Sequence, residues 1–305
     1  ERCTGVFKGH DNRVKCVDWQ GNHIASGSND AIVRIWDAET GECLNCMDQH
    51  KGAVNCVKWF SDCQRIVSGS DDNTLIIWNY ITDKKIKLEG HDDRVYCVAL
   101  SPDEQILASG SNDRTIRFWN VQTGEQLEEM NIISDNVVGH KAQIRALSWS
   151  HYQNFPVLVS GSNDKTLICW KQDENKKWNQ ERVLTGHDDF VYCLSWCPES
   201  TYLVSGSTDN TLWIWNAETE EKIYRMTEHT NYAHGVSWSS DRKYIASASC
   251  DGSVIIWNVE DLPKVTPIHK LIAINAVDIR ECDFTGAEFE TGKLMKLIQM
   301  NGGEV

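Results

Sequence analysis

The chain has 305 residues, 41% of them hydrophobic, and a formal net charge of −14. This length and apolar content are enough for one large hydrophobic core, and no run of apolar residues is long enough for a transmembrane helix. The acidic balance disfavours a nucleic-acid surface, because neutralising phosphates requires a basic footprint. We therefore expect the partners to be other proteins or peptides, with no nucleic acid and no membrane.

Six stretches of the chain repeat the same four residue types at the same spacing. Counted from the aspartate of each stretch, a serine lies four residues earlier and a tryptophan six residues later. A histidine lies about twenty-two residues before the aspartate, and the whole pattern recurs about every 40 residues. The quartets are His10, Ser26, Asp30, Trp36; His50, Ser68, Asp72, Trp78; His91, Ser109, Asp113, Trp119; His140, Ser160, Asp164, Trp170; His187, Ser205, Asp209, Trp215; and His229, Ser247, Asp251, Trp257.

The stretch from His187 to Trp215 shows what each repeat contains. Its segments FVYCLSW, TYLVSGS and TLWIW are short, β-rich runs with a period of two, and a tight turn at Asp209 and Asn210 separates the last two. A fourth strand fits between each tryptophan and the next histidine, for example at 41–47. Four short strands cannot bury a core alone, so successive units must pack side by side, as propeller blades do.

Dipeptide markers at the ends of these units resemble the WD-repeat (WD40) family. They are the Gly-His pairs at 9–10 and 90–91 and the Trp-Asp or Trp-Asn pairs at 36–37 and 119–120. The resemblance covers residues 4–260 and implies an all-β fold, a β-propeller of four-stranded antiparallel blades with six clear WD repeats. A ring closed as seven blades is the alternative, with residues 4–8 as the outer strand of the closing blade.

Serine, histidine and aspartate in one repeat also look like a hydrolase triad. Six copies would be six active sites, each with a tryptophan as a fourth member, so we expect no catalytic residue, no cofactor and no metal site. The resemblance to WD repeats implies instead a buried hydrogen-bond relay. In that relay the aspartate fixes the histidine, the histidine meets the serine, and the serine meets the indole N–H. All members of the six quartets are therefore assigned a structural role.

The twelve cysteines do not predict a disulfide framework. Four of them lie six residues after a repeat histidine, where the other two repeats carry alanine or glycine, so the position requires a small packing side chain. The residues at this position are Cys16, Cys56, Cys97, Ala146, Cys193 and Gly235. Cys43 and Cys46 have CxxC spacing, but a strand would turn them to opposite faces, and no second CxxC pair exists. Free thiols in this number favour a reducing, cytoplasmic compartment.

Two segments depart from the repeat. A charged loop after Trp170 contains Trp178, for which a solvated position is expected. Residues 261–305 lack the repeat markers, and two interpretations stay open. Residues 274–279 resemble the first strand of a repeat, which would make the segment a degenerate closing blade. A five-residue recurrence over 279–294 resembles a pentapeptide-repeat coil, which would make it a C-terminal tail. The missing markers favour the tail.

A propeller places the histidine loops and the hairpin turns on one rim, around the central channel. In the family that the sequence resembles, contact positions lie three and five residues after each histidine and one residue before each aspartate. The first two positions carry basic and aromatic residues and no acidic ones, which suits an acidic or phosphorylated protein segment. Neighbouring aspartates such as Asp93 and Asp188 could neutralise the arginines. The candidate partner-binding residues are Arg13, Lys15, Arg94, Tyr96, Arg145, Phe190, Tyr192, Tyr232 and His234.

These patterns together predict a non-catalytic protein–protein interaction scaffold that binds its partners on the rim around the channel. The alternative is the C-terminal sensor or recognition module of a larger signalling NTPase or ubiquitin-ligase assembly, because the C-terminal segment resembles tails that follow propellers in multidomain NTPases. Additional sequence before Glu1 with a phosphate-binding GxxxxGK motif would favour the alternative.

Overall fold

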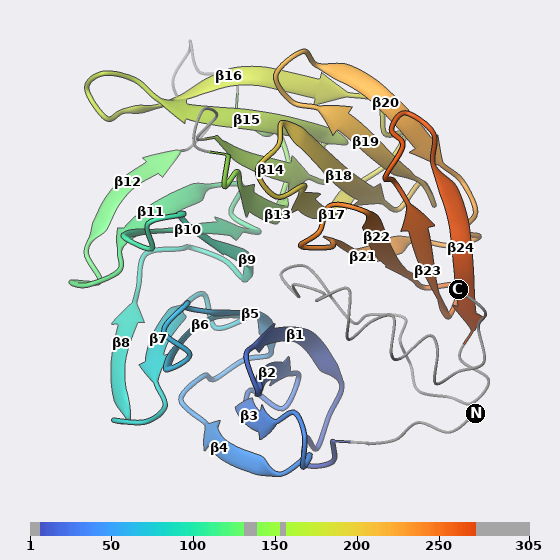
Figure 1. Cartoon of the computed structure of the whole chain (residues 1–305). Helices are drawn as coiled ribbons and strands as arrows, with labels where there is room; N and C mark the ends of the chain where they lie inside the picture. The colour runs from blue at the N-terminus through green and yellow to red at the C-terminus, as the bar shows by residue number, and fades with distance from the viewer. Residues whose placement is uncertain (1–6, 131–138, 153–156, 273–305) are drawn as a thin grey trace.

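The computed structural model describes residues 7–130, 139–152 and 157–272 of the chain. Within these residues the chain forms 24 β-strands in six four-stranded antiparallel sheets (Figure 1). The same residues contain no helix that is long and apolar enough to span a membrane. In chain order, the sheets, or blades, are β1 (Val14–Gln20), β2 (His23–Ser28), β3 (Val33–Asp37) and β4 (Cys43–Met47); β5 (Val54–Trp59), β6 (Arg65–Ser70), β7 (Leu75–Asn79) and β8 (Lys84–Leu88); β9 (Val95–Leu100), β10 (Ile106–Ser111), β11 (Ile116–Asn120) and β12 (Gln126–Met130); β13 (Ile144–Trp149), β14 (Leu158–Ser162), β15 (Thr166–Gln172) and β16 (Trp178–Thr185); β17 (Val191–Trp196), β18 (Tyr202–Ser207), β19 (Leu212–Asn216) and β20 (Glu221–Met226); and β21 (Ala233–Trp238), β22 (Tyr244–Ser249), β23 (Ser253–Asn258) and β24 (Thr266–Ile272).

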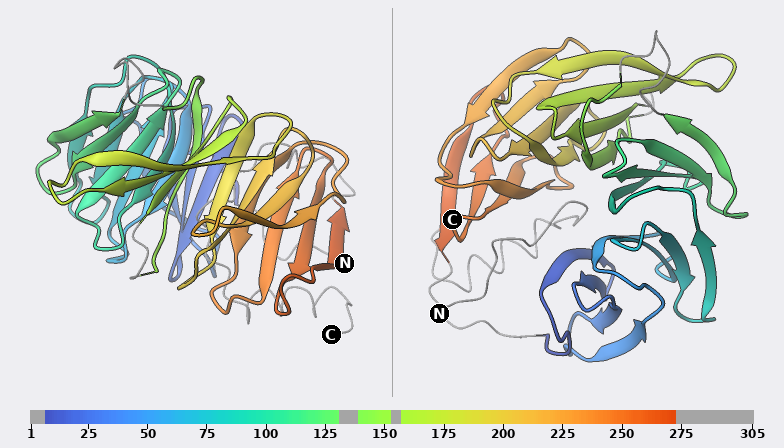
Figure 2. Two further views of the ribbon diagram at one scale, coloured as in Figure 1. Left: turned by 90° about the horizontal axis from the view of Figure 1, so that it is seen from above. Right: turned by 180° about the vertical axis from the view of Figure 1, so that it is seen from behind.

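The blades stand around a central axis in the order of the sequence (Figure 1, Figure 2). In every blade the first strand lies nearest the axis and the fourth strand lies at the outer edge. The innermost strands of consecutive blades pack side by side, from β1 through β5, β9, β13 and β17 to β21. This architecture confirms the prediction of an all-β propeller of four-stranded blades, six of which lie in the described residues.

The hydrophobic core lies in layers between neighbouring blades. Ala25 and Ile35 of blade one, for example, belong to one buried cluster with Trp59 and Trp78 of blade two. Both faces of an inner blade are covered, so its strands are apolar on both sides. Trp19 occupies the position of Trp59 one blade earlier and is 38% exposed, against 3% for Trp59. The exposed fractions differ because blade one packs against Trp59, whereas no blade formed by the described residues precedes Trp19.

The serine-glycine-serine segment in the second strand of blade one touches the next blade closely. A Cβ atom at Gly27 would lie 2.5 Å from Val54 Cγ1 of blade two and 2.7 Å from Cys16 Sγ of β1. Glycine is required there because one backbone approaches another strand at this point. In blade one the glycine is on the second strand, where Gly27 pairs with Cys16 of the first strand. In blade six it is on the first strand, where Gly235 pairs with Ala248. The cysteines of this position are buried, and all ten described cysteines are free thiols.

The sixth blade extends further along the chain than the expected boundary at residue 260. Its fourth strand, β24, runs to Ile272 and pairs with β23. Pro267 is compatible with this strand because β24 is at the edge of its sheet, and Pro267 lies at a register shift opposite Trp257. The predicted tail or closing blade after β24, and most of the strand predicted at 4–8, lie outside the described residues.

The expectation that Trp178 is solvated is wrong. Its side chain is 5% exposed and stacks on Phe118 of blade three, with the ring centroids 4.5 Å apart and the rings 4° from parallel. Trp149 of β13 meets the same indole edge-on at 5.1 Å. The charged residues before Trp178 form the turn of a long β15–β16 hairpin, and the aromatic ring that follows them packs between blades three and four.

Candidate functional site

The quartet of blade five forms a continuous chain of hydrogen bonds. The Trp215 indole N–H donates to Ser205 Oγ at 2.8 Å, and Ser205 Oγ lies 2.7 Å from His187 Nε2. His187 Nδ1 lies 2.9 Å from Asp209 Oδ2. An indole can only donate and an ionised carboxylate can only accept, so Ser205 Oγ accepts from the indole and His187 Nδ1 donates to Asp209.

Asp209 also ties together two segments of backbone. Its carboxylate accepts hydrogen bonds from the backbone N–H groups of Asp188 at 2.9 Å and Thr211 at 2.8 Å, and from the Thr211 hydroxyl at 2.6 Å. Burial alone would raise the pKa of Asp209, but the hydrogen bonds from His187 and Thr211 outweigh it and hold the pKa below its usual range. The ionised aspartate therefore fixes the loop that enters the blade to the hairpin between β18 and β19.

The same geometry recurs around the axis. In all six quartets the histidine Nδ1 lies 2.7–3.0 Å from the aspartate, and Nε2 lies 2.7–2.8 Å from the serine. The six histidines belong to six separate relays and do not gather at one centre. They connect residues within their own blades.

Trp78 of blade two departs from the predicted relay. Its indole N–H donates to Asp83 Oδ1 at 3.0 Å, whereas the other five indoles donate to their serines at 2.7–2.9 Å. Asp83 follows β7 in a turn at a positive φ of 59°, where blades one and three have Gly41 and Gly124. A carboxylate is a stronger acceptor than a hydroxyl, so the indole turns to Asp83 where the turn supplies one.

A β-bulge recurs in the innermost strand of every blade, at the second residue of the strand. In β17, for example, Val191 pairs with Ser207 and Cys193 pairs with Gly206, which leaves Tyr192 as the extra residue. A bulge turns its side chain out of the regular pleat. The same register shift occurs in the other five blades, and the six bulge residues are Lys15, Asn55, Tyr96, Arg145, Tyr192 and His234. We call this set the bulge ring. It contains five of the nine predicted partner-binding residues.

The side of the ring formed by blades one to three, which we call the paired half, consists of Lys15, Asn55, Asp71 and Arg94. Lys15 Nζ donates to Asn55 Oδ1 at 2.8 Å, and Asn55 Nδ2 donates to Asp71 Oδ1 at 2.8 Å. Arg94 Nε lies 3.8 Å from the same Asp71 oxygen, and the charge of Asp71 raises the pKa of Arg94. Burial lowers the pKa of Lys15 while Asp71 opposes that effect. The cations of this half therefore face a carboxylate.

The side formed by blades three to six, which we call the stacked half, consists of Tyr96, Arg145, Tyr192 and His234. Arg145 Cζ lies 3.9 Å from the centroid of the Tyr96 ring and 5.2 Å from that of Tyr192. The Tyr192 and His234 rings follow with their centroids 4.8 Å apart. Arg145 Nε donates to Asn163 Oδ1 at 3.1 Å, and no described residue accepts from its two terminal nitrogens. The guanidinium thus lies over both rings, with the four N–H donors of its terminal nitrogens available.

His234 is neutral at physiological pH. Burial, together with the nearby positive charges of Arg13 and Arg145, lowers its pKa to about 4. Arg13 precedes β1 and Arg145 lies on β13, so residues of blades one and four are each within electrostatic range of His234 in blade six. This places Arg13, Arg145 and His234 at a common surface.

Phe190 and Tyr232 lie on the same rim, two residues before Tyr192 and His234, and are 38% and 47% exposed. Their backbones are fixed, because the carbonyls of Phe190 and Tyr232 accept from Thr208 N at 3.0 Å and Cys250 N at 2.9 Å. Blades five and six therefore add two exposed aromatic rings to the stacked half. The remaining predicted residues are thus also on this rim.

The aspartates that flank the rim have other partners. Asp93 accepts from Asn112 Nδ2 and from the backbone of Arg94, and Asp188 lies 3.7 Å from Arg225. Asp71 faces Lys15 and Arg94, and it was not among the residues named from the sequence. Its position, one residue before the relay aspartate Asp72, was one of the three expected contact positions, and so was that of Asn163.

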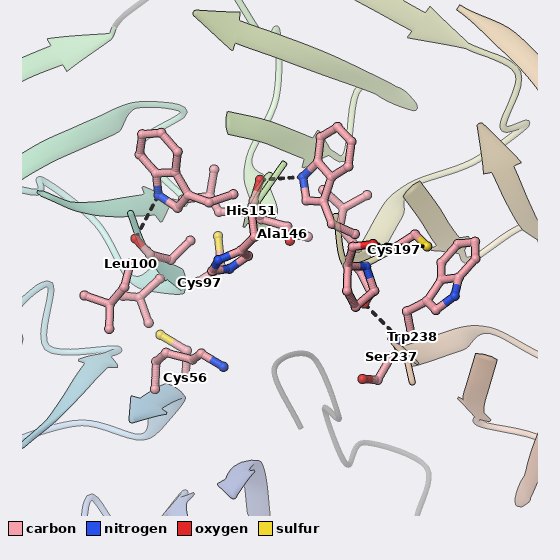
Figure 3. A pocket seen from close by; sticks show the side chains of 18 of the residues that line it. Cys56, Cys97, Leu100, Ala146, His151, Cys197, Ser237 and Trp238 are labelled. Carbon is pink, nitrogen blue, oxygen red and sulfur yellow. Dashed lines mark hydrogen bonds between the residues drawn. The ribbon is translucent and has the colours of Figure 1, made fainter. Parts of the chain in front are cut away.

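The central channel holds a cavity of about 350 Å³ (Figure 3). Small side chains such as Cys56, Cys97 and Ala146 form its walls, and His151 and Trp238 also line it. The described residues contain no cluster of three or more metal-ligating side chains, there or elsewhere. Polar side chains, among them Lys58, Ser195 and Ser237, line the cavity together with the packing residues.

The pattern of six repeats is matched by a known sequence family. The family model described as WD domain, G-beta repeat matches residues 1–37, 41–79, 83–120, 133–171, 178–216 and 220–258. The chain belongs to the WD-repeat family. Each matched WD repeat ends one residue after a quartet tryptophan, and the second, third, fifth and sixth repeats combine the outer strand of one blade with the three inner strands of the next. Successive repeats thereby interlock neighbouring blades.

Relatives of this WD-repeat chain include nuclear distribution protein nudF of Aspergillus niger, 26% identical over 210 residues, which are 63% of this chain and 46% of the relative. Coatomer subunit beta'-2 of Arabidopsis thaliana is 36% identical over 95 residues, 29% of this chain and 10% of the relative. SIR4-interacting protein SIF2 of Saccharomyces cerevisiae is 25% identical over 200 residues, 61% of this chain and 35% of the relative. The chain thus spans less than half the length of these relatives. Propellers of this family are generally non-catalytic interaction scaffolds.

Proposed function

We propose that this WD-repeat propeller is a non-catalytic platform that binds a protein segment on the rim of its central channel. The observation that supports this most strongly is the bulge ring. One backbone feature occurs six times at the same place, and it presents six side chains that include a lysine, an arginine, a histidine and two tyrosines. Tyrosine and arginine are enriched at the energetic centres of protein interfaces.

The names of two relatives are consistent with this proposal. SIF2 is named for interaction with another protein, and the coatomer protein is named as a subunit of an assembly. An acidic or phosphorylated partner segment would complement the arginines through charge-assisted hydrogen bonds and the tyrosines through stacking. The net charge of −14 does not favour an acidic partner, so selectivity for an acidic segment would come from the rim residues themselves.

A reversal of charge on the rim tests the proposal. The triple variant Arg13→Glu, Arg94→Glu, Arg145→Glu should capture less of the partners that the wild-type protein captures in affinity purification. Arg65→Glu is a matched control, because Arg65 also lies over an aromatic ring, that of Phe60 at 4.3 Å, but at the opposite end of its blade. Undiminished capture by the triple variant would remove the proposal.

Two further expectations accompany this function. The ten free thiols among the described cysteines suit a reducing, cytoplasmic compartment. The alternative role, as the recognition module of a larger signalling NTPase or ubiquitin-ligase assembly, stays a prediction. A GxxxxGK motif in sequence preceding Glu1 would support it.

A further inference from the structure

We propose that Arg145 is the residue that receives the anionic side chain of the bound segment, and that an apolar neighbour of that side chain packs on Phe190 and Tyr232. This inference rests on the proposed function of the rim and adds the chemistry and the place of the ligand. It distinguishes Arg145 from the other cations of the rim, which the sequence treats alike.

The first step is charge compensation. Asp71 accepts from Asn55, and Asn55 in turn accepts from Lys15, while Arg94 lies 3.8 Å from the same carboxylate. An incoming anion in the paired half would have to approach Asp71, and the repulsion would offset part of the attraction of the cations. Within the described residues no carboxylate lies within ion-pair distance of Arg145. Lys15 and Arg94 outnumber Asp71, so both halves are net positive. What distinguishes the stacked half is that a ligand can approach Arg145 without meeting a carboxylate of the described residues.

The second step is preorganisation. Arg145 is stacked between Tyr96 and Tyr192, and its Nε is bound to Asn163 Oδ1 at 3.1 Å. Asn163 Nδ2 is held in turn by Gln143 Oε1 at 3.0 Å. An arginine fixed in this way loses little side-chain entropy on binding, and its planar fork suits the paired oxygens of a carboxylate or phosphate monoester.

The third step excludes a cationic ligand. Aromatic rings that surround a cation form a cage, the usual receptor for a methylated lysine. Here the guanidinium of Arg145 already occupies the space between the rings, at 3.9 Å and 5.2 Å from their centroids. A second cation would meet a like charge in place of a ring face. The stacked half therefore selects for anions.

The apolar contact follows from the positions of Phe190 and Tyr232. Each lies on the loop that enters the strand of a stacked residue, Tyr192 or His234, and each exposes more than a third of its surface. A segment that places an oxyanion on Arg145 can continue over blades five and six and cover these rings. The expected ligand is thus a peptide with an acidic or phosphorylated side chain next to an aromatic or aliphatic one.

Degenerate peptide libraries with one fixed residue test the assignment. Three libraries differ only in a central glutamate, phosphoserine or alanine, and their retention is measured on wild-type protein, Arg145→Gln, Arg94→Gln and Arg65→Gln. Wild-type protein should retain the two anionic libraries over alanine, and comparison of glutamate with phosphoserine identifies the anion. Arg145→Gln should lose about tenfold or more of this retention, because charge-assisted hydrogen bonds are lost. Arg94→Gln should lose less than about threefold, since Arg94 is already paired, and Arg65→Gln should match wild-type protein.

The outcomes separate this inference from the proposed function. Equal losses for Arg94→Gln and Arg145→Gln, or equal retention of all three libraries, would overturn the role of Arg145. If at the same time the variant Phe190→Ala, Tyr232→Ala lost protein partners, the rim would still be the binding surface. Retention unaffected by any rim variant would overturn both. Arg145→Lys keeps the charge without the planar fork, and an intermediate loss supports bidentate recognition if Arg145→Gln fails to fold.

Discussion

The relay quartet and the bulge ring each occur six times in this molecule, but they differ in what the repeats share. At the quartet positions all six blades carry the same four residue types, and five of the six make the same chain of three hydrogen bonds. At the bulge position the backbone is the same and the side chains are lysine, asparagine, tyrosine, arginine, tyrosine and histidine. The buried groups of a quartet satisfy one another inside one blade, which keeps them uniform, whereas the bulge side chains contact residues of neighbouring blades and differ from blade to blade.

The largest expected effect is that of Trp178→Ala. Trp178 has no counterpart in the other blades, but it is buried, so we expect it to stabilise the fold and to play no part in binding. Trp178 is 5% exposed and stacked on Phe118, so we expect a loss of about 3–5 kcal/mol in the free energy of unfolding. Denaturant unfolding measures it, and peptide binding at the rim should be unchanged in the folded fraction. A loss below about 1 kcal/mol would show that the stack does not hold blades three and four together.

Asp209→Ala tests the relay quartet, whose residue types are the same in all six blades. It removes the acceptor for His187 Nδ1, the Asp188 and Thr211 backbone and the Thr211 hydroxyl, so we expect a loss of about 3 kcal/mol, the upper end for buried unsatisfied groups. The neighbouring Asp188 is 81% exposed in its side chain, and Asp188→Ala should change stability by less than about 0.5 kcal/mol. An equal effect of the two substitutions would contradict the relay.

The exception at Trp78 predicts a difference between two serines at equivalent positions. Ser205→Ala removes the partner of the Trp215 indole and of His187 Nε2, whereas Ser68→Ala removes only that of His50 Nε2, because Trp78 donates to Asp83. We expect Ser205→Ala to be more destabilising by about 1 kcal/mol. Thermal unfolding of both variants measures it, and equal losses would show that the Asp83 contact does not replace the serine.

The smallest expected effect concerns proton uptake at His234. Its pKa of about 4 lies below the ordinary 6.5, so in the free protein this group makes folding less favourable as pH falls from 6.5 toward 4. An anion bound beside Arg145 would raise that pKa. The anion of the peptide itself takes up protons in the same range, so we expect the affinity of wild-type protein relative to His234→Gln to increase as pH falls through this window. The increase is about tenfold for each pKa unit that the anion restores. A relative affinity that does not change with pH would place the anion elsewhere.

The repeats made most of this structure predictable from the sequence. Four residue types at fixed spacing determined where each hairpin turns, and the alternation of FVYCLSW-type runs located the strands. Trp178 was misjudged because the charged residues before it indicate solvent, while its burial depends on Phe118, far away in the sequence. The roles of Asp71 and Arg145 were likewise hidden. Which cation is paired and which is stacked depends on contacts between blades, and no local pattern contains that information.

The most direct test compares Arg145→Gln with Ser205→Ala in two assays on the same preparations, thermal unfolding and binding of the anionic peptide library. If the relay quartets stabilise the fold and the bulge ring binds the peptide, Arg145→Gln should lose about tenfold or more in peptide affinity with little change in melting temperature. Ser205→Ala should lower the melting temperature by several degrees and bind normally while folded. A parallel loss of both properties in both variants would contradict the separation of structural and functional residues.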